Sequence, residues 1–173
     1  MLVRNLALQE CQEMMSRSVL GRLACARDNQ PYVVPIYFAY ESDRLYGFTT
    51  VGRKIEWMRK NPKVCVEVDE VVDHFRWMSV IVTGRYQELP NTAEFKSERL
   101  HALMTLEKRL LWWQTALAAK QLPTRYESPE PLFYCVLIDS MTGLRAIPDA
   151  VESAIGLAAQ PRTTRKRKRQ SGK

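Results

Sequence analysis

The first regular pattern of hydrophobic and polar positions along the chain is helical. Leu8, Cys11, Met14 and Met15 recur three or four residues apart, so they lie on one face of a helix. This spacing predicts a helix from Ala7 to about Arg17 with one apolar side. We expect that side to be buried against the rest of the fold.

The next segments have the composition of β-strands. LGRLACAR at 20–27 predicts a short strand, and Asp28-Asn29-Gln30 is typical of a turn. PYVVPIYFAY at 31–40 predicts the following strand, where Pro35 must lie at an edge or a bulge because it cannot donate a hydrogen bond. After a turn at 41–43, RLYGFTT at 44–50 is expected to pair with the 31–40 strand as a hairpin.

A short helix is expected after Gly52, with Ile55, Trp57 and Met58 supplying its buried side and Asn61-Pro62 ending it. Two more strands are expected beyond it. KVCVEVDEV at 63–71 alternates regularly between apolar and other side chains, and RWMSVIVTGRYQEL at 76–89 is rich in β-branched and aromatic residues.

The C-terminal half begins with a helical pattern from Asn91 to about Lys120. LFYCVLIDSMTGLRAI at 132–147 then predicts a long last strand with a turn or bulge near Gly143. From Ala159 onward the residues are small, polar or basic, which predicts a disordered tail over 159–173 after a single domain over 1–158. Six strands with helices inserted favour a mainly β (α+β) fold, a small antiparallel barrel.

The excess positive charge belongs to the tail. The formal charge is +7, from 26 basic and 19 acidic residues. Without the tail, 19 of the 26 basic residues remain against 19 acidic ones, so the domain is neutral by this count. We therefore expect no nucleic-acid binding except weakly through the tail. The seven basic tail residues are Arg162, Arg165, Lys166, Arg167, Lys168, Arg169 and Lys173.

The cysteines and the hydropathy indicate an ordinary cytoplasmic protein. Cys11, Cys25, Cys65 and Cys135 form no CxxC pair, so we expect reduced and mostly buried thiols and no metal site. No apolar run reaches the length of a membrane span, and the N-terminus has no apolar core of a signal peptide. We expect no membrane partner.

One segment concentrates candidate binding chemistry: LYGFTTVGRKIEWMRKNP at 45–62. Thr49 and Thr50 offer hydroxyls, Arg53 and Lys54 offer positive charge, and Gly52 lets a ligand approach the backbone. The helix that follows points unpaired N–H groups at the same place. Two cations at a helix start oppose the helix dipole, and a bound phosphate would relieve that conflict.

The ordered series GRLACAR, PYVVPIYFAY, LYGFTTVGRKIEWMRKNPKVCVEVDEV and WMSVIVTGRYQELP resembles the pyridoxamine 5'-phosphate oxidase-like, FMN-binding split-barrel family over roughly residues 5–147. It looks most similar to the branch of flavin-nucleotide-binding and nitroimidazole-resistance proteins. The resemblance implies a six-stranded split barrel that forms a homodimer, with FMN at the subunit interface.

The resemblance also implies site residues. Arg53 and Lys54 match the family's phosphate-binding pair, and Phe48 and Thr49 match the two residues before it. Ser79, five positions before Gly84, would reach the phosphate or the ribityl chain. The backbone of Val34, Pro35, Ile36 and Tyr37 would border the flavin ring, whose walls or substrate stack could include Tyr37, Phe48, Trp77, Trp112 and Trp113.

The chain departs from this family in ways that limit the inference. An arginine expected near Val34 and a C-terminal arginine-histidine motif are absent, so oxidation of pyridoxamine phosphate is not expected. Phe48 stands where some nitroimidazole-resistance members carry a histidine. The leading hypothesis is an FMN-dependent oxidoreductase acting on a small molecule. The alternative is a non-catalytic protein that binds or stores flavin, or binds F420 or heme.

Overall fold

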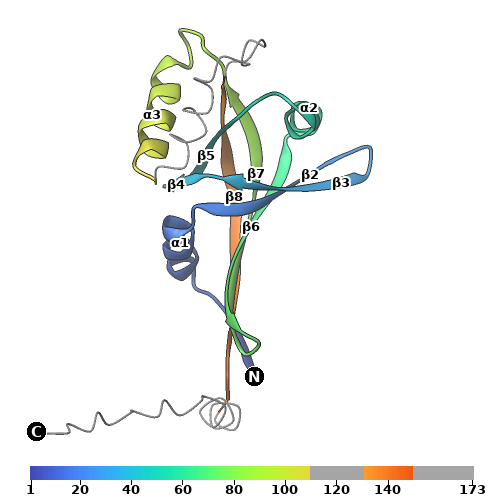
Figure 1. Cartoon of the computed structure of the whole chain (residues 1–173), viewed down its shortest axis with the longest axis vertical. Helices are drawn as coiled ribbons and strands as arrows, with labels where there is room; N and C mark the ends of the chain where they lie inside the picture. The colour runs from blue at the N-terminus through green and yellow to red at the C-terminus, as the bar shows by residue number, and fades with distance from the viewer. Residues whose placement is uncertain (110–130, 150–173) are drawn as a thin grey trace, which may run out of the picture.

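The computed structural model describes residues 1–109 and 131–149. Within them three helices accompany one antiparallel sheet of eight strands (Figure 1). The helices are α1 (Leu8–Arg17), α2 (Arg53–Lys60) and α3 (Lys96–Glu107). The strands are β1 (Leu2–Asn5), β2 (Leu20–Arg27), β3 (Gln30–Tyr37), β4 (Ala39–Glu41), β5 (Arg44–Thr49), β6 (Lys63–Asp73), β7 (Arg76–Leu89) and β8 (Leu132–Ile147).

The sheet runs in the order β3-β2-β6-β7-β8-β5-β4, with β1 paired to the far end of β8. Figure 1 shows β6, β7 and β8 along the long axis, where the β6–β7 hairpin and the end of β8 continue past α1. We call this narrow extension the arm. Long strands of this kind pair with more than one neighbour. β8 pairs with β7 over most of its length, with β5 through its first residues and with β1 through its last.

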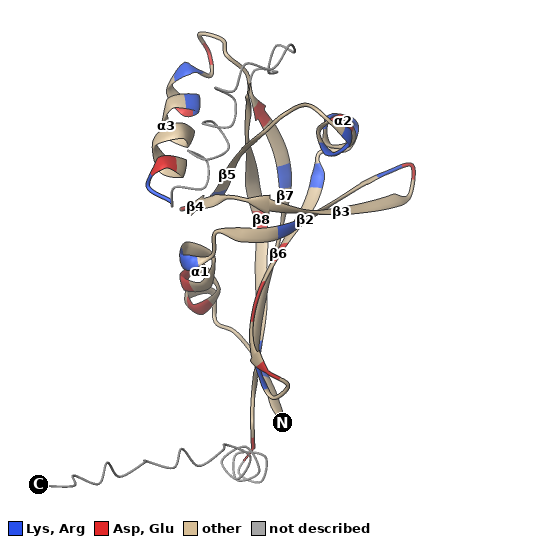
Figure 2. Cartoon of the chain, in the orientation of Figure 1, with Lys and Arg blue, Asp and Glu red and all other residues tan. Residues whose placement is uncertain are grey.

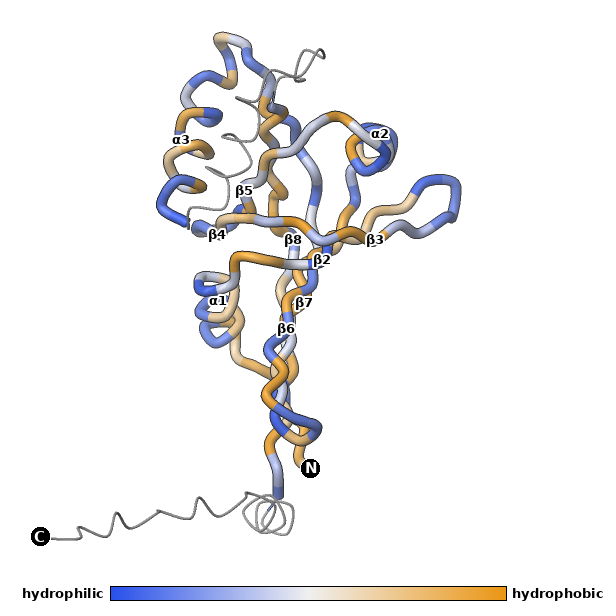
Figure 3. Tube along the Cα trace, viewed as in Figure 1, coloured by the Kyte–Doolittle hydropathy of each residue, from blue (hydrophilic) through white to orange (hydrophobic). Residues whose placement is uncertain are grey.

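Buried and exposed side chains alternate along the strands, so one face of the sheet lies in the core. Hydrophobic and hydrophilic residues alternate along the same strands in Figure 3. In β6, Val64, Val66 and Val68 are buried, as their spacing predicted. Helix α1 covers part of this inner face through Cys11, Met14 and Met15, as predicted, and joins them to the main core cluster. Leu8 was expected on the same buried face but is 60% exposed, in the first turn of the helix.

The structure corrects the number of strands and one of the pairings. The described residues form eight strands where six were expected, and the segment 31–40 is divided at Phe38 between β3 and β4. The hairpin partner of β5 is β4 alone, whereas β3 pairs with β2. At this point the chain changes its pairing partner from β2 to β5. Phe38 lies between the two strands, is only 2% exposed, and donates its N–H to the carbonyl of Val19 at 3.1 Å.

Strands β3 and β4 lie at opposite ends of the hydrogen-bonded order, although one residue separates them in the chain. The sheet must therefore curve strongly enough to bring its two ends near each other. No register pairs β3 with β4 among the described strands, so a closed barrel stays a prediction. Pro35 does lie on an edge strand, as expected.

The bulge in the last strand is also displaced from its expected position. The β7–β8 register shifts between Thr83 and Gly84, opposite Asp139, whereas Gly143 pairs regularly with Val80. The turn at Asp28 and Asn29 is confirmed by their positive φ angles of 51° and 62°.

Three further expectations can be placed. Helix α3 begins at Lys96, five residues later than predicted. The disordered tail and the Trp112-Trp113 pair lie outside the described residues. All four cysteines are free, and three of them are buried, while Cys65 is half-buried. None of the described helices has the length and apolarity needed to cross a membrane.

Candidate functional site

The candidate site is built around the start of α2. Helix α2 has eight residues, buries Ile55 and Met58, and is capped at its N-terminus by Gly52 without any side-chain hydrogen bond. Its first N–H groups therefore lack the capping partner that most helix starts have. Figure 2 shows that positive residues dominate this short helix. The site thus combines a helix N-terminus with two cations, Arg53 and Lys54.

No carboxylate of the described residues neutralises either cation. Within residues 1–109 and 131–149, no carboxylate lies within ion-pair distance of Arg53 or Lys54. Many other arginines of this part of the chain are paired, for example Arg17 with Glu70 and Arg59 with Glu88. Two neighbouring cations without acids therefore distinguish this helix start from the rest of the surface.

Lys54 is the more buried of the two. Its side chain is half-buried, and loss of solvent lowers the pKa of its ammonium below the usual value. A desolvated cation without a carboxylate is unfavourable until an anion reaches it. Arg53 is exposed and lies over the ring of Tyr32, 5.5 Å from its centroid, and Tyr32 in turn contacts Trp57 at 5.4 Å.

The approach to these cations is open. Gly52 has an extended backbone with φ of −177°, and a Cβ added there would meet no atom within 4 Å. Thr49 and Thr50 precede it, partly and fully exposed, and the Thr49 hydroxyl donates a weak 3.3 Å hydrogen bond to the carbonyl of Thr50. We call the group Thr49, Thr50, Gly52, Arg53 and Lys54 the phosphate cluster, because its donors and charges suit a phosphate.

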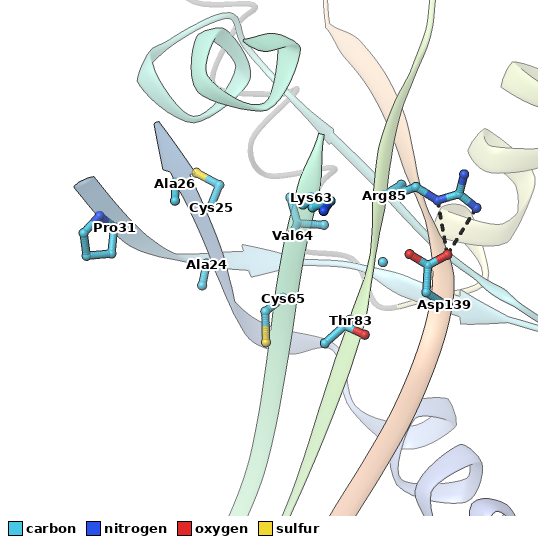
Figure 4. A pocket seen from close by; sticks show the side chains of 11 residues that line it. Ala24, Cys25, Ala26, Pro31, Lys63, Val64, Cys65, Thr83, Arg85 and Asp139 are labelled. Atoms are coloured by element: carbon cyan, nitrogen blue, oxygen red, sulfur yellow. Dashed lines mark hydrogen bonds and ion pairs between the residues drawn. The ribbon is translucent and has the colours of Figure 1, made fainter. Parts of the chain in front are cut away.

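A cavity of about 510 Å³ lies against β2, β6, β7 and β8 (Figure 4), and α2, which carries the two cations, contacts β2. The cavity is lined by small side chains of β2 and β6, such as Ala24 and Cys65, and by the ion pair of Arg85 with Asp139. Cys25 lies between the cavity and the phosphate cluster. It lines the cavity, and although burial raises the pKa of its thiol, the positive charge of Lys54 acts on that pKa in the opposite direction. The arrangement suits a ligand with a phosphate at one end and an apolar ring at the other.

The four predicted residues of β3 divide between its two faces. Ile36 is buried in the main core and Val34 packs against it, whereas Pro35 and Tyr37 are exposed on the outer face. A ligand on one face of β3 can therefore contact all four residues only through their backbone. Pro31 and Pro35 occupy positions of β3 whose backbone nitrogen points away from β2, so neither proline interrupts the β2–β3 hydrogen bonds.

Phe48 belongs to a different environment. It packs against the second core cluster, beneath α3, with its ring 5.9 Å from that of Phe133. Its side chain thus contributes to packing beside the phosphate cluster. Sequence reasoning missed Tyr32, which supports Arg53, although its place two residues before Val34 on the same strand was a usable signal.

Trp77 and Ser79 are not part of this arrangement within one chain. Ser79 pairs with Asp69 and Leu144, toward the arm. Gly84, five residues further along β7, pairs with Val64 of β6, and Val64 in turn pairs with Cys25 of β2. Five residues of strand span about 17 Å, so one chain holds Ser79 far from Lys54.

Comparisons with known proteins agree with this fold. Residues 8–145 match the family model described as pyridoxamine 5'-phosphate oxidase. An uncharacterized protein of Rhizobium meliloti (strain 1021), RA0666, is 46% identical over 147 residues, which are 84% of this chain and 97% of the relative.

Several solved structures resemble the chain, among them the following two. A FAD-binding protein (mll6688) of Mesorhizobium loti is 43% identical and superposes with a TM-score of 0.68 over 84% of this chain and 99% of that one. A FAD binding protein of Mycobacterium smegmatis, 23% identical with a TM-score of 0.59, covers 83% and 98% and shows likeness of fold.

Proposed function

This chain belongs to the pyridoxamine 5'-phosphate oxidase family, and we propose that it binds a flavin through the phosphate of the FMN unit. The observation that carries this proposal is the pair of unneutralised cations, Arg53 and Lys54, at an uncapped helix start beside the open Gly52. The FAD-binding relative from Mesorhizobium loti supports flavin as the class of ligand. In this arrangement Arg53 would bind phosphate oxygens with two N–H groups and Lys54 would act as a point charge.

We further propose that two copies of the chain complete the site. The outer face of the sheet exposes large apolar side chains that the β2–β3, β6–β7 and β7–β8 registers place on one side. A second copy packed there would cover these side chains and would bring its own Ser79 and Trp77 toward the phosphate cluster of the first. The exposed residues are Leu20, Val33, Tyr37, Ile81 and Leu144.

Substitution of Ile81 by aspartate tests this homodimer. We expect the wild-type chain to show twice its 20.1 kDa mass in size-exclusion chromatography with light scattering. Ile81→Asp should give a monomer with at least tenfold weaker flavin binding, because a charge would enter the apolar face. Leu8→Asp, on α1 and 60% exposed, is the matched control and should stay dimeric. A wild-type monomer that binds flavin fully would refute the shared site.

The proposed activity is a flavin-dependent oxidoreductase reaction on a small molecule. Bound flavin would accept two electrons from a reduced donor and pass them to an acceptor. The protein's own contribution would be to hold the phosphate, orient the ring beside β3 and exclude water from the apolar cavity. Neither histidine joins the cluster, since His101 bonds to Glu41 at 2.5 Å and His74 lies at the turn of the arm.

Spectra of the purified protein test the proposal. We expect the visible absorption bands of an oxidised flavin, bleaching on anaerobic addition of NADH or NADPH, and recovery of the bands with a small acceptor. A flavin that binds but cannot be reduced by either donor would favour the alternative, a protein that binds or stores the cofactor. A colourless protein that takes up neither FMN nor FAD would overturn the proposal.

A further inference from the structure

We infer that the flavin is the dinucleotide FAD, and that its adenylate half lies in a second cavity beside the phosphate cluster. The inference rests on the proposed function, because it extends the same cofactor beyond its FMN unit. It adds a site at which no part of FMN would bind, and it therefore predicts different behaviour for the two flavins.

The second cavity has a volume of about 250 Å³ and lies between α2, the end of β7 and the start of β8. It is smaller than the 300–1,000 Å³ typical of pockets for whole drug-sized ligands, so it suits one end of a larger molecule. Val51, which lines it, is the residue directly before Gly52. Val51 therefore joins the cavity to the phosphate cluster, because its chain neighbours Thr50 and Gly52 belong to that cluster.

Gly52 provides the passage between the two places. Its extended backbone carries no side chain, and the space that a Cβ would occupy is open for at least 4 Å. The first N–H groups of α2 adjoin this opening. A pyrophosphate crossing Gly52 would have one phosphate near Arg53 and Lys54 and the next near Val51, at the mouth of the cavity.

The walls of the cavity suit a purine nucleoside. Val51, which is 53% exposed, lies with Pro90 and Leu132 on the lining and offers apolar surface to a flat base. Asn91 carries a side-chain amide, whose donor and acceptor match an adenine edge.

Glu88 supplies the remaining group. Arg59 donates two hydrogen bonds to its carboxylate, at 2.7 and 2.8 Å, and these lower the pKa of Glu88. The carboxylate is therefore ionised at neutral pH and held in one orientation. A fixed carboxylate of this kind can accept hydrogen bonds from ribose hydroxyls, as acidic residues do in other dinucleotide sites.

The test compares FMN and FAD on the full-length protein stripped of cofactor, by isothermal titration calorimetry. We expect FAD to bind at least tenfold more tightly than FMN. Val51→Trp, which fills the cavity from an exposed position, should weaken FAD at least tenfold and leave FMN within about twofold. Asn91→Ala should weaken FAD alone. Leu100→Trp, an equally bulky change at an exposed position of α3, is the matched control.

The outcomes separate this inference from the proposed function. Equal affinities for FMN and FAD, with equal changes in both for Val51→Trp, would refute the adenylate cavity and leave the phosphate cluster standing. Failure of the wild-type protein to bind either flavin would overturn both. Loss of both flavins in Arg53→Ala/Lys54→Ala, with selective loss of FAD in Val51→Trp, would support both.

Discussion

Replacing Arg53 and Lys54 together by alanine is expected to weaken flavin binding at least a hundredfold while the protein keeps its fold. Each hydrogen bond from a charged donor contributes about 1.5–3 kcal/mol, so losing two costs about 3 kcal/mol or more. Every 1.4 kcal/mol is a factor of ten in affinity. Because neither cation is paired with a carboxylate in the part of the chain described, the fold loses no ion pair.

The measurement is titration of the cofactor-free protein with flavin, beside urea unfolding of the same sample. Lys60→Ala with Lys96→Ala is the matched control, since it removes two exposed lysines outside the phosphate cluster. That control should bind flavin as the wild type does, apart from a small loss of general electrostatic attraction. Unchanged flavin affinity in the Arg53/Lys54 variant would place the phosphate elsewhere.

The largest effect on stability is expected from Gly84→Ala. A Cβ at Gly84 would lie 2.3 Å from the backbone carbonyl oxygen of Leu137 and 2.9 Å from a methyl group of Val136. The clash is with backbone at the β7–β8 register shift, so no flexible side chain can move away. We expect a loss of about 3 kcal/mol, at the upper end of the range for overpacked cores.

Urea denaturation of the cofactor-free protein measures this loss. With a slope of about 2 kcal/mol per molar urea, the midpoint should fall by about 1.5 M. Gly52→Ala is the matched control, because its Cβ would meet nothing within 4 Å and its φ of −177° suits any residue. It should leave the midpoint unchanged. A Gly84→Ala midpoint equal to that of the control would show that the two strands can separate at the bulge.

Much of the local structure could be predicted from spacing alone. The valines at 64, 66 and 68 alternate without interruption, so their burial follows from the two-residue period of a strand. The apolar face of α1 and the boundaries of α2, between Gly52 and Asn61, were equally accessible, because helix periodicity and end signals are local.

The division at Phe38 could not be predicted. PYVVPIYFAY reads as one continuous strand, since its local composition does not change at Phe38. What divides it is the choice of partners: residues up to Tyr37 pair with β2, and residues from Ala39 pair with β5 at the other end of the sheet. The position of the bulge at Asp139 depended in the same way on β7.

The residues of the phosphate cluster could be found without a structure, because Thr49 to Lys54 are contiguous and a helix start needs only local signals. The surroundings of the cluster depend on the folded arrangement of the strands. Among the described residues this arrangement left the two cations without a paired carboxylate, placed Tyr32 under Arg53, and held Ser79 far along β7. The physical reason is that pairing and burial depend on residues distant in sequence, whereas periodicity and helix ends depend on neighbours.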